Sequence, residues 1–210
     1  MPKVNISVLV SGGGTNLQTI IDGIDSGYID QGQITQIISS LKDAFALNRA
    51  AKSGIKGLHI GKDNFPDEAQ RTEAILEALN GAKTGLIVLA GYMSLLPPEI
   101  IQRYRHRIIN IHPSLIPDFC GLGFYGQKVH EAVLASGAER TGATVHFVDE
   151  GLDTGDIILQ REVPVLKTDT VSTLAARVLE TEHQLLPEAV RQLCRKLKGE
   201  CVNESIDQRI

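Results

Sequence analysis

The chain has 210 residues, of which 42% are hydrophobic and 22% are charged, and its formal net charge is -4. This length and apolar content favour one large core, so we expect a single domain of the α/β class over residues 1–210. No run of eighteen apolar residues occurs, and no long apolar stretch follows Lys3. These features argue against a membrane span or an export signal and favour a cytoplasmic protein.

The mildly acidic charge balance also argues against nucleic-acid binding, because the basic residues are scattered. One short basic cluster, from Arg191 to Lys198, is interpreted as the solvated face of a helix. The three cysteines, Cys120, Cys194 and Cys201, are odd in number and show no CxxC spacing. This pattern argues against a disulfide framework or a structural zinc site and predicts reduced thiols.

The first two thirds of the chain alternate strand-like and helix-like segments. Strands are predicted at residues 4–10, 34–39, 58–60, 86–90 and 107–111, and helices at 16–24, 44–52, 67–79, after Pro97-Pro98, and at 129–134. The fully apolar segment 86–90 is typical of a parallel strand that is covered on both faces. The pattern therefore predicts a doubly wound, mostly parallel sheet.

The last third of the chain follows a different pattern. Residues 144–148 alternate apolar and polar side chains, and residues 157–165 follow a turn rich in Gly and Asp, which predicts a hairpin-like antiparallel addition to the sheet. Residues 171–197 have one apolar side at helical spacing and predict a long C-terminal helix with a kink at Pro187.

A glycine loop, Gly12-Gly13-Gly14-Thr15-Asn16, follows the first predicted strand and opens the first predicted helix. Unpaired backbone N–H groups and the helix dipole favour an anion there. The loop matches neither GxGxxG nor GxxxxGK[ST], so a smaller phosphate such as a ribose 5-phosphate is favoured over a dinucleotide or a nucleoside triphosphate. The alternative is a tight turn in which Thr15 or Asn16 caps the helix. The loop alone does not decide between them.

Asn110 and His112 lie at the carboxyl end of a predicted strand, where the two-residue period places both on one side. Together with Asp153 in a later turn, they are the groups needed to polarise and protonate a carbonyl, which indicates acyl-group chemistry. A nearby carboxylate is expected to raise the pKa of His112 above its usual value of about 6.5. The alternative is an Asn that caps a turn beside a structural His, and spacing alone does not pair Asp153 with His112.

The other histidines carry weaker signals. His146 lies on an alternating strand from which it could reach the site, and His183 lies in the long helix, but a structural role is favoured for each taken alone. His59, His106 and His130 show no partner pattern, and no HExxH-type spacing exists. We therefore predict no catalytic metal.

Seven segments of the chain resemble the glycinamide ribonucleotide formyltransferases of purine biosynthesis and occur in the order of that family. These segments are residues 10–18 (VSGGGTNLQ), 43–47 (DAFAL), 88–93 (VLAGYM), 109–117 (INIHPSLIP), 142–148 (GATVHFV), 152–155 (LDTG) and 182–183 (EH). The NIHPSL-type motif is shared by formyltransferases in general, whereas the SGxG[ST]NL loop is specific to the glycinamide branch. The resemblance implies a Rossmann-like formyltransferase fold.

The resemblance also implies a reaction, in which the formyl group of 10-formyltetrahydrofolate passes to the amino group of 5-phosphoribosylglycinamide on the route to IMP. Gly14, Thr15 and Asn16 would bind the 5-phosphate of the substrate, and Glu182 would engage its glycinamide portion. The resemblance implies small-molecule substrates as the only partners, with no metal and no binding to nucleic acid or membranes. It also implies a monomer or a homodimer.

For the folate cosubstrate, the resemblance implies that Met93, Ser94, Leu95 and Leu96 hold the pterin. The loop of residues 148–153 would close over the same ring. Asn110 and His112 would flank the formyl carbon, with Asn110 also binding the cosubstrate, and Asp153 would keep His112 charged.

The chain departs from the family pattern in some ligand contacts. Glu68 stands where many members carry a basic residue near the folate tail, with Arg71 one turn later as a substitute, and Ser94 replaces a residue that is often basic. The loop of residues 119–126 lacks the histidines that some members carry, so ligand contacts from this loop are not carried over.

Two alternative functions share parts of this pattern. A formyltetrahydrofolate hydrolase would use the same Asn, His and Asp, but its relatives carry an additional N-terminal domain, for which we expect no room before Val4. A non-enzymatic phosphosugar-binding protein would need the glycine loop without His112 and Asp153.

Overall fold

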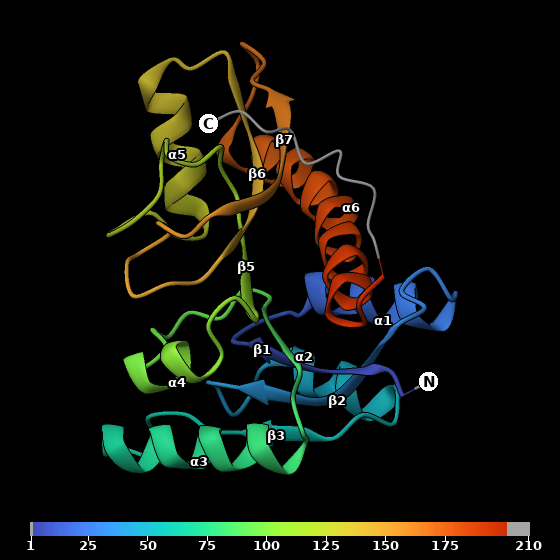
Figure 1. Ribbon diagram of the computed structural model, residues 1–210. Helices are drawn as coiled ribbons and strands as arrows, with labels where there is room; N and C mark the ends of the chain where they lie inside the picture. The colour runs from blue at the N-terminus through green and yellow to red at the C-terminus, as the bar shows by residue number, and fades with distance from the viewer. Residues whose placement is uncertain (1, 201–210) are drawn as a thin grey trace.

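The computed structural model describes residues 2–200, which form one seven-stranded sheet with helices packed against it (Figure 1). The strand order is β3-β2-β1-β4-β5-β6-β7. Neighbouring strands from β3 to β5 are parallel, and β6 pairs in antiparallel fashion with both β5 and β7. The strands are β1 (Val4–Val10), β2 (Gly32–Ser39), β3 (Gly57–His59), β4 (Leu86–Leu89), β5 (Ile108–His112), β6 (Arg140–Phe147) and β7 (Ile157–Pro164). The predicted doubly wound sheet with an antiparallel addition is confirmed.

In the described part of the chain, six helices connect or cover these strands. They are α1 (Thr15–Asp25), α2 (Phe45–Lys52), α3 (Glu68–Gly81), α4 (Pro98–Arg103), α5 (Gln127–Ser136) and α6 (Val171–Leu197). Figure 1 shows α3 and α4 at one end of the molecule and α5 beside the β6–β7 hairpin at the other. None of these helices has the length and apolar content that a membrane crossing would need.

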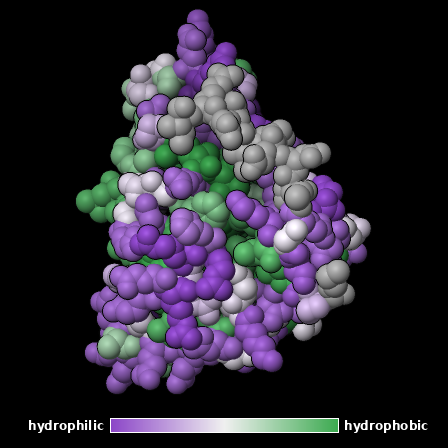
Figure 2. All heavy atoms as spheres, in the orientation of Figure 1, coloured by the Kyte–Doolittle hydropathy of each residue, from purple (hydrophilic) through white to green (hydrophobic). Residues whose placement is uncertain are grey.

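Side chains of the central strands alternate between two apolar cores, one on each face of the sheet. In β1, Val8 and Val10 belong to the core that includes α1 and α6, whereas Leu9 belongs to the core that includes α3 and α4. All four residues of β4 are buried. Because both faces are covered, β4 is apolar throughout rather than alternating. Figure 2 shows a mostly hydrophilic surface in the lower part of its view, with apolar side chains gathered higher up.

The long helix α6 has the bounds that were predicted and begins with a capping box formed by Thr170 and Thr173. It continues through Pro187, which is buried. Gly23 of α1 faces this point, since a β-carbon there would lie 3.9 Å from the Pro187 Cβ and 2.9 Å from Ile29. This close packing of α1 against α6 brings Glu182 next to the beginning of α1.

The carboxyl ends of β1 and β4 are linked directly through Ser11. Its backbone N–H donates to the Gly91 carbonyl at 3.1 Å, and its Oγ accepts the Met93 N–H at 2.8 Å. The same hydroxyl bonds the Ser40 hydroxyl at the end of β2. The segment after β4 is therefore positioned by the residue that precedes the glycine loop, at the sheet edge where open α/β folds bind ligands.

Candidate active site

The last glycine of the glycine loop is Gly14, which is the N-cap of α1 and has a left-handed φ of 70°. A β-carbon at Gly14 would lie 2.7 Å from the Ala46 Cβ, so both the backbone angle and the space require glycine. No side chain of the described residues caps α1. The alternative in which Thr15 or Asn16 caps the helix is therefore wrong, and the first-turn N–H groups have the arrangement that binds anions.

Asn16 and Glu182, which are 166 positions apart, meet through a hydrogen bond from the Asn16 Nδ2 to the Glu182 Oε2 at 2.6 Å. Both side chains are buried. Burial raises the pKa of Glu182 to about 7, although the bond from Asn16 acts in the opposite direction. Within residues 2–200 the buried Asn16 Oδ1 has no partner. The structure thus places two predicted substrate-binding residues side by side.

The structure also brings Asn110, His112 and Asp153 together. The Asp153 Oδ2 lies 3.6 Å from the His112 Nδ1, and the Asp153 Oδ1 lies 3.5 Å from the His146 Nε2. The Asn110 Nδ2 lies 3.2 Å from the same His146 Nε2. Asp153 is in the turn between β6 and β7 and has a left-handed φ of 56°. His146 therefore joins the cluster, in contrast to the structural role that was favoured for it from the sequence.

Backbone contacts define the tautomers of the two rings. The His112 Nε2 lies 2.9 Å from the Phe119 carbonyl oxygen, so this nitrogen carries the hydrogen. The His146 Nδ1 donates to the Phe147 carbonyl at 2.8 Å, and its Nε2 faces both the Asn110 amide and the Asp153 carboxylate. The Asp153 Oδ2 accepts the Gly121 N–H at 3.0 Å. The loop of residues 119–126 thus contacts both His112 and Asp153.

The expected rise in the pKa of His112 is wrong. Burial lowers the pKa of His112 below its ordinary value, although the Phe119 carbonyl and the Asp153 carboxylate both raise it. The desolvation of a buried charge exceeds the attraction of one carboxylate at 3.6 Å. For Asp153, burial raises the pKa, but contacts with His146, the Gly121 N–H and His112 leave the pKa below its ordinary value. At neutral pH the pair is therefore a neutral imidazole and an ionised carboxylate.

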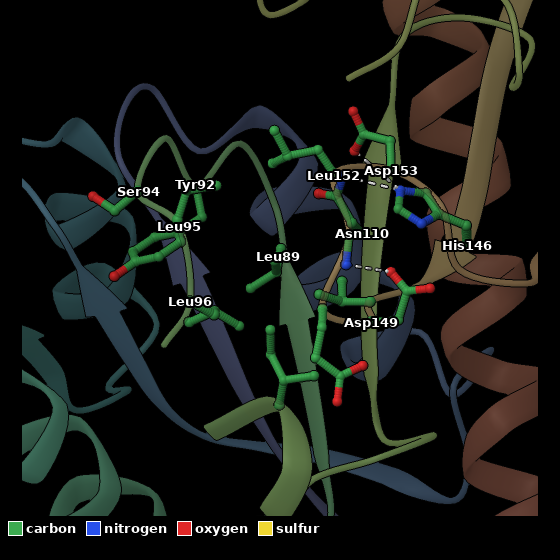
Figure 3. A pocket seen from close by; sticks show the side chains of 14 residues that line it. Leu89, Tyr92, Ser94, Leu95, Leu96, Asn110, His146, Asp149, Leu152 and Asp153 are labelled. Atoms are coloured by element: carbon green, nitrogen blue, oxygen red, sulfur yellow. Dashed lines mark hydrogen bonds and ion pairs between the residues drawn. The ribbon is translucent and has the colours of Figure 1, made fainter. Parts of the chain in front are cut away.

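A cavity of about 210 Å³ opens beside this cluster (Figure 3). Its polar side is formed by Asn110, His146 and Asp153, and Figure 3 shows Tyr92 and Leu96 across from them, with Leu89 next to Asn110. The complete lining is Leu89, Tyr92, Ser94, Leu95, Leu96, Ile101, Asn110, His146, Val148, Asp149, Glu150, Gly151, Leu152 and Asp153. One wall is thus apolar, and the other carries hydrogen-bonding groups.

The cavity includes most of the residues that were predicted for the pterin. Ser94, Leu95 and Leu96 line it, as does all of the loop 148–153, but Met93 does not and is exposed. His112 is buried behind the lining. The sequence did not identify Leu89, Tyr92 and Ile101 as cavity residues. Leu89 and Ile101 lie in a strand and a helix, where apolar residues are interpreted as core. Tyr92 could have been identified from its position beside Met93.

Several other predicted features have structural positions of their own. Arg71 donates to the Phe65 carbonyl at 3.0 Å and is not part of the cavity lining. Cys120 and Cys194 are free thiols, and Cys201 lies outside the described residues. Within residues 2–200 no group of three or more His, Cys, Asp or Glu side chains could hold a metal ion.

Comparison with known proteins gives matches over nearly the whole chain. A family model described as formyl transferase matches residues 4–190. The chloroplastic phosphoribosylglycinamide formyltransferase of Vigna unguiculata is 41% identical over 91% of this chain, which spans 61% of that relative's length. The crystal structure of glycinamide ribonucleotide transformylase 1 from Symbiobacterium toebii is also 41% identical, with a TM-score of 0.86, and the match covers 97% of this chain and 92% of that one.

A formyltetrahydrofolate deformylase from Pseudomonas syringae has the same fold, with a TM-score of 0.83, but is only 25% identical. The match covers 92% of this chain and 62% of the deformylase chain. Sequence similarity is thus clearly greater to the glycinamide ribonucleotide enzymes than to this deformylase.

Proposed function

This chain belongs to the formyl transferase family, in its phosphoribosylglycinamide formyltransferase branch, and we propose that it transfers the formyl group of 10-formyltetrahydrofolate to the amino group of 5-phosphoribosylglycinamide in purine biosynthesis. The observation that carries the proposal is the cavity bordered by Asn110, His146 and Asp153, at the same sheet edge as the glycine loop. A cavity with one apolar wall and a few convergent polar groups suits a ring such as the pterin.

On the substrate side, the N–H groups of Gly14, Thr15 and Asn16 would bind the 5-phosphate at the beginning of α1. Glu182, held by Asn16, would engage the glycinamide portion. The pKa of Glu182 is about 7, so near neutral pH its carboxyl can either accept or donate a hydrogen bond. The Asn16–Glu182 pair would thereby connect recognition of the phosphate to placement of the amine.

On the cosubstrate side, the pterin would lie between Leu95 and Leu96 on one wall and the loop of residues 148–153 on the other. Ser94 and the backbone groups of that loop would meet its polar edge. The formyl group would then face Asn110, which would bind the cosubstrate as well as act on it.

The chemical step would be direct transfer without a covalent enzyme intermediate. The amine attacks the formyl carbon, a new C–N bond forms, and the carbonyl oxygen becomes an oxyanion. The Asn110 N–H that is not bonded to His146 stabilises this oxyanion, and one such donor contributes roughly 3 kcal/mol. The bond to N10 of the folate then breaks, as a proton passes from the attacking nitrogen to N10.

His112 and Asp153 would act on the oxyanion and on the proton. His112 would serve as a neutral N–H donor, exchanging the Phe119 carbonyl for the oxyanion. The ionised Asp153 would accept the proton of the attacking amine, directly or through water, and return it to N10. This assignment replaces a charged His112 by a neutral one.

The proposal is tested by assaying the purified protein with 10-formyltetrahydrofolate in the presence and absence of 5-phosphoribosylglycinamide. We expect folate to be consumed only when the ribonucleotide is present, with formation of its formyl derivative. Consumption without the ribonucleotide would identify a hydrolase, and binding without consumption would identify a phosphosugar-binding protein. The cytoplasmic location and the monomeric or dimeric state stay predictions.

A further inference from the structure

Helix α2 holds two successive carbonyl groups of the glycine loop. The Gly12 carbonyl accepts the backbone N–H of Ala46 at 3.1 Å, and the Gly13 carbonyl accepts the Nε–H of Arg49 at 2.8 Å. Neither contact involves the sheet or α1. Two neighbouring peptide groups of the loop are therefore held from outside the loop, by α2.

The orientation of these carbonyls determines where the N–H groups of the loop point. In a planar trans peptide, the C=O and the following N–H point in opposite directions. Because the Gly12 and Gly13 carbonyls face α2, the N–H groups of Gly13 and Gly14 point away from α2. Glycine permits many backbone angles, so without these contacts the peptide between Gly13 and Gly14 would be free to turn.

Arg49 is fixed by more than its bond to the loop. Its NH1 donates to the Gln18 Oε1 at 3.0 Å, and its guanidinium lies 5.2 Å from the centre of the Phe45 ring. Its Cδ lies 3.4 Å from the position that a β-carbon on Gly14 would take. The side chain thus spans from Gly13 to the first turn of α1, and the glycine loop itself contains no lysine or arginine.

We infer that Arg49 is a positioning residue for the phosphate: it holds the peptide between Gly13 and Gly14 so that the Gly14 N–H faces the anion, and its charge favours a dianion at the loop. The inference rests on the proposed function for the identity of the phosphate ester. It adds a residue of α2 to a site otherwise formed by the loop, α1 and α6.

The test compares Arg49→Met and Arg49→Lys with the unaltered protein. Methionine keeps much of the apolar stem over Gly14 but has no donor and no charge. We expect Arg49→Met to raise the KM for 5-phosphoribosylglycinamide by about tenfold, with kcat and the KM for 10-formyltetrahydrofolate unchanged. Lysine keeps the charge and a donor and should restore part of the affinity.

A second substrate separates positioning of the phosphate from a merely structural role. With the dephosphorylated glycinamide riboside, kcat/KM should be the same in Arg49→Met and the unaltered protein. An equal loss with both substrates, or an unchanged KM for the phosphorylated one, would overturn the inference. Arg140→Met, which removes an exposed arginine paired with Glu162 on the β6–β7 hairpin, is the matched control.

Binding of ribose 5-phosphate, measured by calorimetry, keeps the inference testable apart from catalysis. If the unaltered protein formylates no substrate, the proposed function fails, but about tenfold weaker binding of ribose 5-phosphate by Arg49→Met would still support the role of Arg49. Equal binding by both proteins would exclude it. Thermal unfolding of each variant verifies that the chain is folded.

Discussion

The phosphate side of the proposed site obtains its shape from contacts to the backbone of the glycine loop, whereas the formyl side depends on contacts among side chains from separate segments. Gly12 to Gly14 are oriented by α2 and begin α1 directly. Asn110 and His112 on β5, His146 on β6 and Asp153 in the following turn meet only because β5 and β6 pair in antiparallel register.

This difference has consequences for what each side tolerates. The phosphate side should be sensitive to changes in backbone freedom and space, and the formyl side to changes in charge and hydrogen bonding. Ser11 and the Asn16–Glu182 pair connect the glycine loop to other segments and should show intermediate behaviour.

The largest effect is expected for Asp153→Asn, because the amide cannot accept the proton of the attacking amine. We expect kcat to fall about 10³-fold with little change in stability, measured by steady-state kinetics and by thermal unfolding. Asp156→Asn, an exposed carboxylate of the same turn, should retain activity. Near-normal turnover of Asp153→Asn would show that Asp153 does not accept the proton of the attacking amine.

Glu182→Gln should change the pH dependence of stability. The pKa of Glu182 in the folded state is raised from 4.5 to about 7, so the stability associated with its protonated form is present below pH 4.5 and is lost as the pH rises through 7. Between pH 4.5 and pH 8, the free energy of unfolding of the unaltered protein should fall by about 3 kcal/mol more than that of the Gln variant, as measured by urea unfolding.

The matched control for this measurement is Glu73→Gln, which removes an exposed carboxylate of α3. In this variant the free energy of unfolding should depend on pH in the same way as in the unaltered protein. If Glu182→Gln behaved in the same way as Glu73→Gln, the buried pair with Asn16 would not be a titrating element of the site.

A smaller loss of stability is expected for Gly14→Ala, since the new methyl group meets Ala46 at 2.7 Å and the φ of 70° is unfavourable. The free energy of unfolding should fall by about 2 kcal/mol. For Gly12→Ala the free energy of unfolding should fall by less than about 1 kcal/mol, because nothing lies within 4 Å of a β-carbon at this position. Equal losses would mean that backbone geometry does not distinguish the two glycines.

The smallest effect is expected for Ser11→Ala, which removes the acceptor of the Met93 N–H. The KM for 10-formyltetrahydrofolate should rise about fivefold, which corresponds to one hydrogen bond of about 1 kcal/mol, while the KM for 5-phosphoribosylglycinamide stays within twofold. Ser136→Ala, which removes a hydroxyl of α5, provides the control. Equal rises in both KM values would indicate general loosening rather than positioning of the segment after β4.

Much of the fold could be predicted from the sequence because local patterns determine it. The apolar run of β4 and the helical spacing of α6 reflect which side chains face a core, and core contacts repeat with the period of the element. Strand and helix ends were less certain: β2 begins at Gly32 rather than at Ile34, and β6 at Arg140 rather than at Thr144. In β6 the additional residues are included by pairing with β7, which spacing does not reveal.

The site was predictable in part. The motifs around Asn110 and His112 placed these residues at a strand end, and family resemblance identified Asp153 and Glu182. His146 was undervalued, because its importance depends on two partners, Asn110 and Asp153, that lie on other segments. Leu89 and Ile101 could not be distinguished from core residues, since an apolar cavity wall has the same composition as a core.

The alternation of strands and helices, the glycine loop at the start of a helix and the residue types of the site follow from the sequence, because they depend on short-range spacing. The direction of the pKa shift of His112 depends on its burial in the folded chain, since burial outweighs the attraction of Asp153. The packing of the whole chain also brings Asn16 to Glu182 and the Arg49 guanidinium to the Gly13 carbonyl. Desolvation and long-range contacts depend on the whole packed chain, and no local pattern encodes them.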